Sequence, residues 1–451
     1  MSESLLAVLD PQDHRIRRQK VSPLFSTKAT DMMAPKVLAI AQKAAKCMAE
    51  RGRQQRPIDM HRLCRSFSAE VLFKTLFGQS QDFIGSQEEH PELLKSIDAF
   101  LSHIWMIKSF PIISWLALNM PQSLAQKSSS RVQKFQRCKH NAPIFIHRPS
   151  LPVPLRFVLQ TNQVIFQNCE KWAELSINRQ ASGKAANNDP LTNTLFDLIL
   201  APSTDYDPSP STVPELVDEA FMFVIAGTDS AGNTMANALY YILSSPAVSS
   251  RLLTELQDNG ITSQESFDYR LVQRLPYLTA VLKETMRIYT LAPGLFPRIV
   301  PDGGVTIGAH YIPAGVSIKS KQEFPVPMHQ SRNTSLTRTP RKQTVISETI
   351  HSVHHNPAIF PAPETFDPER WLNDHDKVLE KFFVPYSKGS RICLGMNLAN
   401  AEMYIILALL FSRFEMELYE TDASSVEWVD RGNAFNRSTV KVRVQRDRWA
   451  S

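Results

Sequence analysis

Apolar side chains recur every three or four residues along most of this chain, which is the spacing of helices that bury one face. The helices predicted in this way cover residues 36–50, 68–78, Val213–Leu243, Pro276–Tyr289 and a segment directly after Cys393. Thr212 is expected to cap the longest of them, with Pro214 in its first turn. Apolar residues alternate instead over 304–318, 414–420 and 440–445, which predicts strands. The pattern indicates a mainly α fold with a small β part.

Two long stretches do not fit this pattern. Residues 138–169 and 321–350 are punctuated by proline and show no helical period, and both are long for connections inside a compact domain. They are either exposed insertions or segments foreign to the evolved fold. The prediction is therefore a single domain over residues 1–451, with doubtful inserted stretches at about 138–169 and 321–350.

Composition and charge exclude several classes of protein. The 451 residues, 43% of them hydrophobic, are enough for an extensive core, so the chain is not a disordered one. Five widely spaced cysteines favour neither a disulfide framework nor a four-cysteine zinc site. The net charge of +6 comes without a basic block interleaved with aromatic residues, so no nucleic-acid partner is expected.

Membrane-directed segments are weak in this sequence. The first residues hold only a short apolar run before Asp10 and Asp13, which fits neither a signal peptide nor a membrane span. The most apolar segment is Ile104–Met120, which Lys108 and Pro111 interrupt. We expect a buried helix pair or a loop that dips into a membrane surface there.

The segment "YSKGSRICLG", residues 386–395, is the strongest candidate for cofactor chemistry. A thiolate from Cys393 could donate electron density to iron, and close glycines let backbone N–H groups approach the sulfur and tune the metal. Gly395 would let the next helix start beneath a flat macrocycle, and Arg391 could pair with an acidic edge of it. An isolated Cys-Leu-Gly, however, more often marks a buried structural thiol.

Glutamate and arginine are spaced for an ion pair on the helix predicted over Pro276–Tyr289. Glu284 and Arg287 lie three residues apart on one face, and Arg370 in "FDPERW" could bring a second arginine to the same carboxylate. Taken alone, Glu-x-x-Arg is an ordinary helix ion pair of small energetic weight.

The long helix carries "VIAGTDSAGNT", residues 224–234. Ala226 and Gly227 remove side-chain bulk from one turn, so that another group could lie against the helix. Asp229 and Ser230 add an acid and an alcohol to an apolar stretch, where an unpaired carboxylate would be costly. The alternative interpretation is a local kink with Ser230 bonded back to its own helix.

In this order along the chain, the four signals resemble those of the cytochrome P-450 family of haem-thiolate monooxygenases. The cysteine loop of that family reads Phe-x-x-Gly-x-Arg-x-Cys-x-Gly, and four of its five positions match here, with Tyr386 in place of the Phe. The resemblance covers nearly the whole chain apart from the two doubtful stretches. It implies the cytochrome P-450 fold without its N-terminal anchor and its first β and helical elements.

The resemblance implies haem b as the cofactor, with Cys393 as the axial ligand of the iron. The other residues expected to bind the haem are Tyr386, Gly389, Arg391, Gly395, Arg298, His14, Arg18, Ala226 and Gly227. Of these, the arginines and the histidine would reach the propionates. Asp229 and Ser230 match the acid–alcohol pair that delivers protons, so they are the expected catalytic residues. The residues that resemble the structural salt-bridged triad of the family are Glu284, Arg287 and Arg370.

The implied reaction is the reductive activation of O₂ and the oxidation of an apolar small molecule. The segments "FVPYSKGSRICLGMNLA" and "HRIRRQKVSPLFS" are most similar to the fungal secondary-metabolite branch, whose substrates include terpenoids and polyketides. No flavin or nicotinamide motif is visible, so electrons would come from NADPH-cytochrome P-450 reductase, with cytochrome b5 as a second donor. The residues expected to form its docking face, or an ordinary solvated face, are Arg15, Arg17, Arg18, Lys20 and Lys388.

Family members act as monomers in the endoplasmic reticulum membrane, whereas a chain without an anchor would be peripheral or cytoplasmic. They also carry roughly a hundred residues ahead of the early helix, an anchor, a small sheet and a substrate-contacting loop, that have no counterpart here. Together with the two doubtful stretches, this favours an imperfectly spliced or decayed gene. A catalytically incompetent haem-binding remnant is therefore the second interpretation of the sequence. Finding both stretches in the mature transcript would contradict the splicing hypothesis.

The acid–alcohol pair leads to a first prediction. The Ser230→Ala variant should divert electrons from product into peroxide, because it removes the hydroxyl that a proton relay needs. The measurement is the ratio of product and of peroxide to the reduced cofactor consumed. Unchanged coupling of electrons to product would refute a relay role for Ser230.

Overall fold

The computed structural model describes residues 4–86, 91, 93–98, 101, 163–182, 194–201, 207, 209, 212–314, 344–375 and 377–450. The helices in this part of the chain are α1 (Pro11–Val21), η1 (Ser22–Phe25), α2 (Thr27–Arg53), α3 (Met60–Leu76), α9 (Gln163–Ala181), α10 (Leu195–Ile199), α11 (Val213–Leu243), α12 (Pro246–Asp258), α13 (Tyr269–Val272), α14 (Pro276–Ile288), α15 (Ile350–His354), α16 (Glu369–Leu372), α17 (Val378–Phe382), η3 (Gly389–Arg391), α18 (Met396–Arg413) and η4 (Ala423–Val426).

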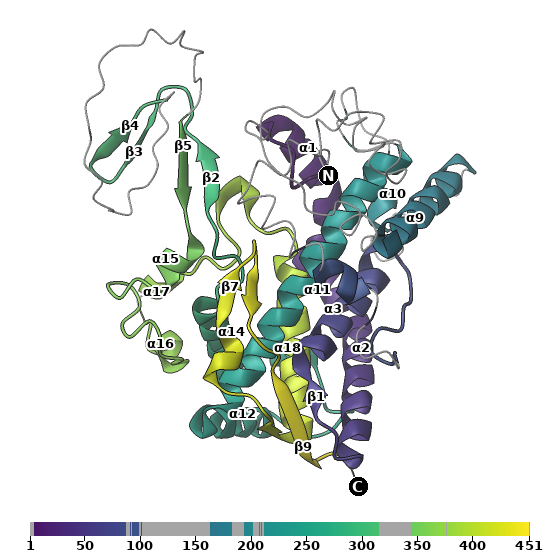
Figure 1. Ribbon diagram of the computed structural model, residues 1–451, viewed down its shortest axis with the longest axis vertical. Helices are drawn as coiled ribbons and strands as arrows, with labels where there is room; N and C mark the ends of the chain where they lie inside the picture. Colours follow the sequence, from purple (N-terminus) through teal and green to yellow (C-terminus); the bar gives the residue numbers. More distant parts are fainter. Residues whose placement is uncertain are drawn as a thin grey trace, which may run out of the picture.

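The described strands are β1 (Ile58–Asp59), β2 (Phe296–Ile299), β3 (Val305–Ile307), β4 (His310–Ile312), β5 (Val345–Glu348), β6 (Phe414–Leu418), β7 (Trp428–Asp430), β8 (Ala434–Asn436) and β9 (Lys441–Asp447). They form one three-stranded antiparallel sheet in the order β1-β9-β6 and three two-stranded ribbons, β2-β5, β3-β4 and β7-β8. The β2-β5 ribbon rises from the helical body, with β3-β4 beside it (Figure 1).

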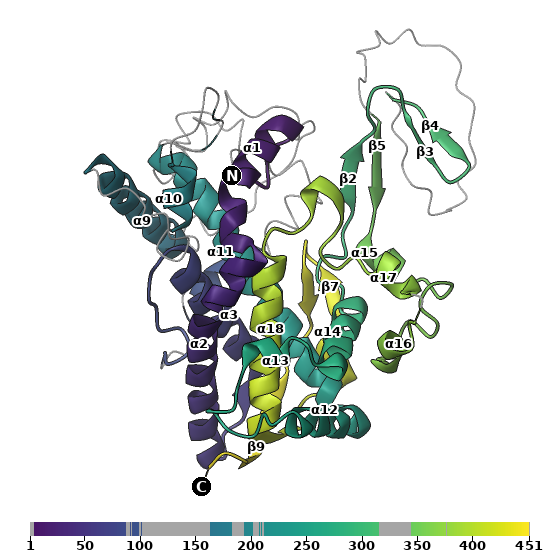
Figure 2. The same ribbon diagram turned by 180° about the vertical axis from the view of Figure 1, so that it is seen from behind.

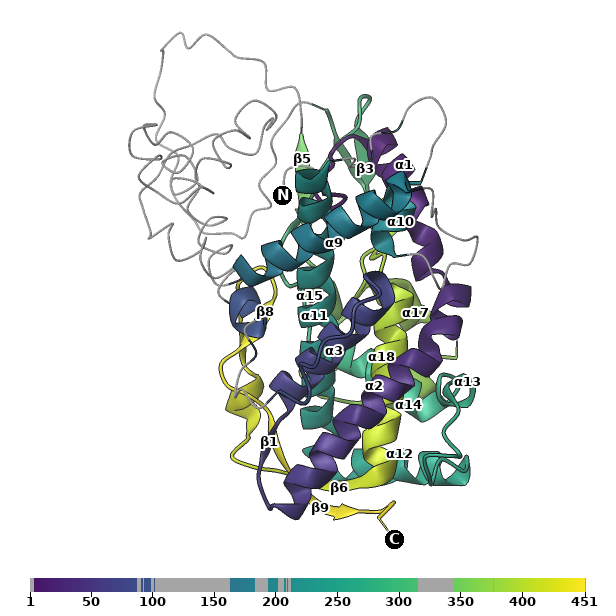
Figure 3. The same ribbon diagram turned by 90° about the vertical axis from the view of Figure 1, so that its right-hand side faces the viewer.

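Four long helices form the centre of the molecule. In the bundle α3 packs against α11, α2 packs against α18, and α2–α3 and α11–α18 contacts close it. All three views show these helices side by side, and α9 lies across α11 in Figure 3. Two clusters of buried apolar side chains fill the interior, one between α2, α11, α14 and α18 and one around α1, α9 and the first half of α11. The bundle therefore places the segment after Cys393 next to the middle of the chain.

Sequence-specific signals explain the limits of the central helices. The predicted helix over Val213–Leu243 has those bounds in α11, where the Thr212 N–H donates to Glu215 Oε2 at 3.0 Å. The helix predicted over Pro276–Tyr289 ends one residue earlier, as α14. α2 and α3 begin well before their predicted starts because Ser26 and Asp59 cap them with side-chain oxygens.

Two expectations about the doubtful stretches were wrong at their ends. Helix α9 begins at Gln163, so residues 163–169 are helical although the pattern there shows no helical period. β5 pairs with β2, Arg298 opposite Ile346, so residues 345–348 belong to the fold. The partner of β5 lies far away in the sequence, and a local pattern cannot reveal such pairing. Residues 138–162, residues 321–343 and the segment Ile104–Met120 lie outside the described residues.

The observed architecture is mainly helical with small sheets, as predicted from the sequence. Among the residues that the structure describes, no helix is long and apolar enough to cross a membrane.

Candidate functional site

The cysteine loop is a tight turn that leads into α18. Ser387 and Gly389 adopt positive φ angles of 62° and 78°. This left-handed conformation favours glycine, which explains the residue type at position 389. The Cys393 N–H donates to the Tyr386 carbonyl at 2.9 Å, which closes the loop. Gly395 then occupies the N-cap position of α18. A Cβ added at Gly389 or Gly395 would meet no atom within 4 Å, so protein does not fill the space beside either residue.

The Cys393 thiol is the exposed cysteine of the described chain, whereas Cys64 and Cys169 are buried. Although one side of Cys393 is open, the protein packed around its other sides raises the pKa of the thiol. The Gly395 N–H, hydrogen-bonded to the sulfur, and the charge of Arg18 oppose this rise and favour the thiolate. An exposed thiol with a backbone donor and a nearby cation is suited to bind a metal. It does not fit a buried structural cysteine.

The hydroxyl of Tyr386, which stands in place of the usual Phe, is hydrogen-bonded to helix α18. Its Oη donates to Asn400 Oδ1 of α18 at 2.6 Å. Burial raises the pKa of this phenol, so it stays protonated. The substitution therefore adds a tie between the cysteine loop and the second turn of α18.

Cations gather next to the cysteine loop from three distant parts of the chain. Burial lowers the pKa of Arg391, and so do the charges of Arg298 and Arg18, which places these guanidinium groups close together. His14 is buried beside them, and burial followed by the charges of Arg391 and Arg18 lowers its pKa to about 4. None of the three arginines is ion-paired with a carboxylate within the described ranges. Such a cluster of unpaired cations favours an anionic ligand.

Other predicted cationic residues have structural partners. Arg17 is buried and donates to Glu219 Oε2 at 2.9 Å, and Lys20 donates to the carbonyls of Ile199 and Ala201 and to Asp207. Their inclusion in a docking face was therefore wrong, because these side chains tie α1 to α11 and to the segment after α10. Arg15 and Lys388 are exposed.

The glycine-containing turn of α11 faces two different neighbours. Ala226 is exposed in the middle of this mostly buried helix, so one side of the turn is open. A Cβ on Gly227 would approach Leu72 Cδ1 of α3 to 2.3 Å, so Gly227 makes room for α3. The structure thus separates the two residues that the sequence pattern groups together.

Asp229 and Ser230 also point to different partners. Asp229 is fully buried, its Oδ1 lies 2.7 Å from Arg65 Nε of α3, and Asn233 Nδ2 donates to its Oδ2 at 3.0 Å. Burial raises the pKa of Asp229, and the Arg65 charge opposes the rise. Ser230 Oγ donates to the Ala226 carbonyl at 2.6 Å, which is the bond back to its own helix that the alternative interpretation describes. Ser230 nevertheless lies on the same turn as the exposed Ala226.

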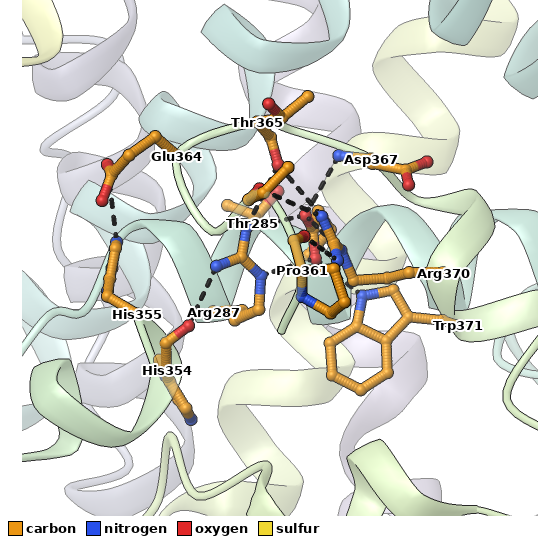
Figure 4. A network of polar contacts seen from close by, with 12 residues as sticks. Thr285, Arg287, His354, His355, Pro361, Glu364, Thr365, Asp367, Arg370 and Trp371 are labelled. Carbon is orange, nitrogen blue, oxygen red and sulfur yellow. Dashed lines mark hydrogen bonds and ion pairs between the residues drawn. The ribbon is translucent and has the colours of Figure 1, made fainter. Parts of the chain in front are cut away.

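The fully buried carboxylate of Glu284 is the centre of a polar network (Figure 4). Arg287 donates to both of its oxygens at 2.8 and 2.9 Å, and Arg370 Nε donates to Oε1 at 3.0 Å. Trp371 Nε1 and the Asp367 N–H complete the shell at 2.9 and 3.0 Å. Two arginines therefore share one carboxylate, and the network joins α14 to the segment that precedes the cysteine loop.

His354 connects this network to the cysteine loop, a role that the sequence analysis missed. Its carbonyl accepts from Arg287 Nη1 at 3.0 Å (Figure 4). Its Nε2 accepts from the Val384 N–H at 3.0 Å. Burial and then the Arg287 charge lower the pKa of His354 to about 3, so the ring is a neutral acceptor. No signal in "HSVHHNPAIF" distinguishes His354 from its neighbours His351 and His355.

Comparisons with known proteins agree with this geometry. The family described as Cytochrome P450 matches residues 2–320 and 338–434. Cytochrome P450 monooxygenase phqM of Penicillium fellutanum is 33% identical over 446 residues, 99% of this chain and 73% of that protein. Cytochrome P450 monooxygenase asqL of Emericella nidulans is 33% identical over 449 residues, 100% of this chain and 81% of that protein. A crystal structure of a cytochrome P450 (CYP102L1) superposes with a TM-score of 0.68 at 15% identity, covering 98% of this chain and 84% of that chain.

The Arg65–Asp229 pair leads to a stability prediction. Replacing Arg65 by Met should lower the free energy of unfolding by about 3–5 kcal/mol, because a buried carboxylate loses its cation. Asp229→Asn in the same background should restore part of the loss. Urea unfolding at neutral pH measures the effect, with Lys74→Met, an exposed cation on the same helix, as the control. Equal stability of Arg65→Met and the control Lys74→Met would contradict a buried charge at Asp229.

A second prediction concerns the acid sensitivity that His354 confers. Since its folded pKa of about 3 lies below its ordinary value of 6.5, the unfolded chain binds the extra proton, and stability falls as the pH drops through this window. His354→Phe should flatten this pH dependence while losing about 1–3 kcal/mol at pH 7.5, where the Val384 N–H lacks an acceptor. Unfolding curves from pH 4 to 8 measure both effects. The exposed His375, changed to Phe, is the control.

Proposed function

The chain belongs to the cytochrome P450 family and is a cytochrome P450 monooxygenase, and from this premise we propose that it oxidises an apolar small molecule in fungal secondary metabolism. Membership of the family implies a haem, O₂ and a redox partner that supplies electrons. The two curated relatives named above come from fungi. Terpenoids and polyketides are the substrate classes that we favour.

The observation that carries the proposal is the exposed Cys393 thiol, with the Gly395 N–H on its sulfur and open space beside both loop glycines. This donor set fits the thiolate ligand of haem b. The unpaired guanidinium groups of Arg18, Arg298 and Arg391 suit the two propionates of the same cofactor. The thiol and the three arginines thus match the iron and the propionates of one ligand.

The bound haem supplies the redox chemistry, in which O₂ is activated by two electrons for insertion into a C–H bond. The residues of the chain orient the cofactor and manage protons. Ser230 Oγ is the hydroxyl on the open turn of α11, next to Ala226. Asp229, held by Arg65 and Asn233, fixes the backbone of that turn and is one residue from the hydroxyl. We assign proton delivery to this pair.

Electron transfer requires an outside donor. We propose NADPH-cytochrome P-450 reductase, with cytochrome b5 as a second donor, at the endoplasmic reticulum membrane. Of the predicted docking residues, we assign to an acidic partner the exposed Arg15 and Lys388, although Lys388 also donates to the Lys381 carbonyl.

The proposal is tested by the spectrum of the reduced protein with carbon monoxide. The purified chain should give the red-shifted band of thiolate-ligated haem, and Cys393→Ser should abolish it because an alcohol does not replace the thiolate. Cys47→Ser, which alters a half-buried cysteine of α2, is the matched control and should keep the band.

A chain that binds haem without the red-shifted band would contradict the proposed activity. It would support the second interpretation, an incompetent haem-binding remnant.

A further inference from the structure

A buried acid in α18 is unused by the function proposed above. Glu402 is 2% exposed, and its Oε2 lies 2.5 Å from the Oγ of Ser68 in α3. Burial raises the pKa of Glu402 to about 8. The hydrogen bond with the Ser68 hydroxyl opposes this rise. The phenol of Tyr386 is the titratable group of the cysteine loop that feels this carboxyl. Glu402 is therefore a neutral acid near pH 7.

The Ser68 hydroxyl touches a third helix. Its Oγ lies 3.0 Å from the Gly227 carbonyl of α11, in addition to the Glu402 carboxyl. A hydroxyl carries one proton and can donate to only one of these oxygens. A protonated Glu402 resolves the conflict, because it donates to Ser68, and Ser68 then donates to the Gly227 carbonyl. An ionised Glu402 would compete with the carbonyl for the same proton.

The contact lies on the segment of α11 that holds Asp229 and Ser230. One face of α3 presents Arg65, Ser68 and Leu72 to α11, where Gly232 and Gly227 let it approach. A Cβ on Gly232 would lie 2.7 Å from the Arg65 Cα, so the two backbones are nearly in contact. Two successive carbonyls of α11 thus accept side-chain hydroxyls, that of Ala226 from Ser230 and that of Gly227 from Ser68.

We propose that Ser68 and Glu402 are positioning residues that hold the Gly227 carbonyl and thereby fix the turn of α11 that carries Asp229 and Ser230. They act through the backbone and contact neither haem nor substrate. The inference rests on the proposed function, since positioning matters for catalysis only if this turn delivers protons. A buried contact among α3, α11 and α18 keeps the turn in place.

Hydrogen exchange of the purified protein tests this positioning without turnover. Ser68→Ala and Glu402→Ala should speed exchange of the backbone amides over residues 226–234 by about tenfold, the effect of losing a buried hydrogen bond. Ser66→Ala is the matched control, because Ser66 is buried on the same helix and its hydroxyl has no hydrogen-bond partner among the described residues. Exchange in Ser68→Ala that equals exchange in Ser66→Ala would overturn the proposal.

The conservative variant Glu402→Gln separates positioning from simple packing. It keeps a neutral donor, so it should exchange like the parent at pH 6. Above about pH 8 the parent should exchange faster than Glu402→Gln, after correction for intrinsic rates, because only the parent ionises there. A Glu402→Gln variant that behaves like Glu402→Ala would overturn the proposal.

Coupling of electrons to product should fall in Ser68→Ala and in Glu402→Ala, and should stay near that of the parent in Glu402→Gln. Failure of the proposed function is distinguishable, because a missing carbon-monoxide band would leave the exchange results unchanged.

Discussion

The buried carboxylate of Glu284 is the constraint that holds α14, the segment around α16 and the approach to the cysteine loop together. It accepts five hydrogen bonds, two from Arg287 and one each from Arg370, Trp371 and the Asp367 backbone. A charge without water is tolerable only with such a complete shell of donors. Because its donors come from α14 and from the segment around α16, the shell fixes that segment, and His354 passes the constraint on to Val384 and the cysteine loop.

The close crossing of α3 and α11 is the corresponding constraint within the helical bundle. Gly232 lets Arg65 approach, and the guanidinium then pairs with Asp229. The charge pair is buried, and its cost is offset by direct contact and by the Asn233 amide. The same face of α3 brings Ser68 to Gly227 and, through Glu402, to α18. The turn with Ser230 is therefore held by three helices.

Much of the fold and part of the site could be predicted from local pattern. The apolar periodicity and the cap of α11 predict that helix. The glycines of the cysteine loop predict a tight turn, and Gly389 has the positive φ angle that such a turn requires. Arg65, Ser68, His354 and Glu402 could not be found in this way. Each is an ordinary residue in its own helix, and its partner lies at least thirty positions away, as for Val384 and His354. The docking role of Arg17 was wrong for the same reason, because Glu219 is distant in sequence.

The sequence by itself determined which residue types carry the chemistry: a cysteine flanked by arginine and glycine, an acid and an alcohol on a long helix, and a glutamate with two arginines. Such motifs are local because the loop or helix turn that presents them is local. Only the tertiary structure decided how they are held. Cys393 is exposed on one side, and Gly227 faces α3 rather than the open side of its turn. The charges of Arg18 and Arg298 act on Arg391 from two other elements. Burial and pairing depend on the whole packing, and no short stretch of sequence contains that information.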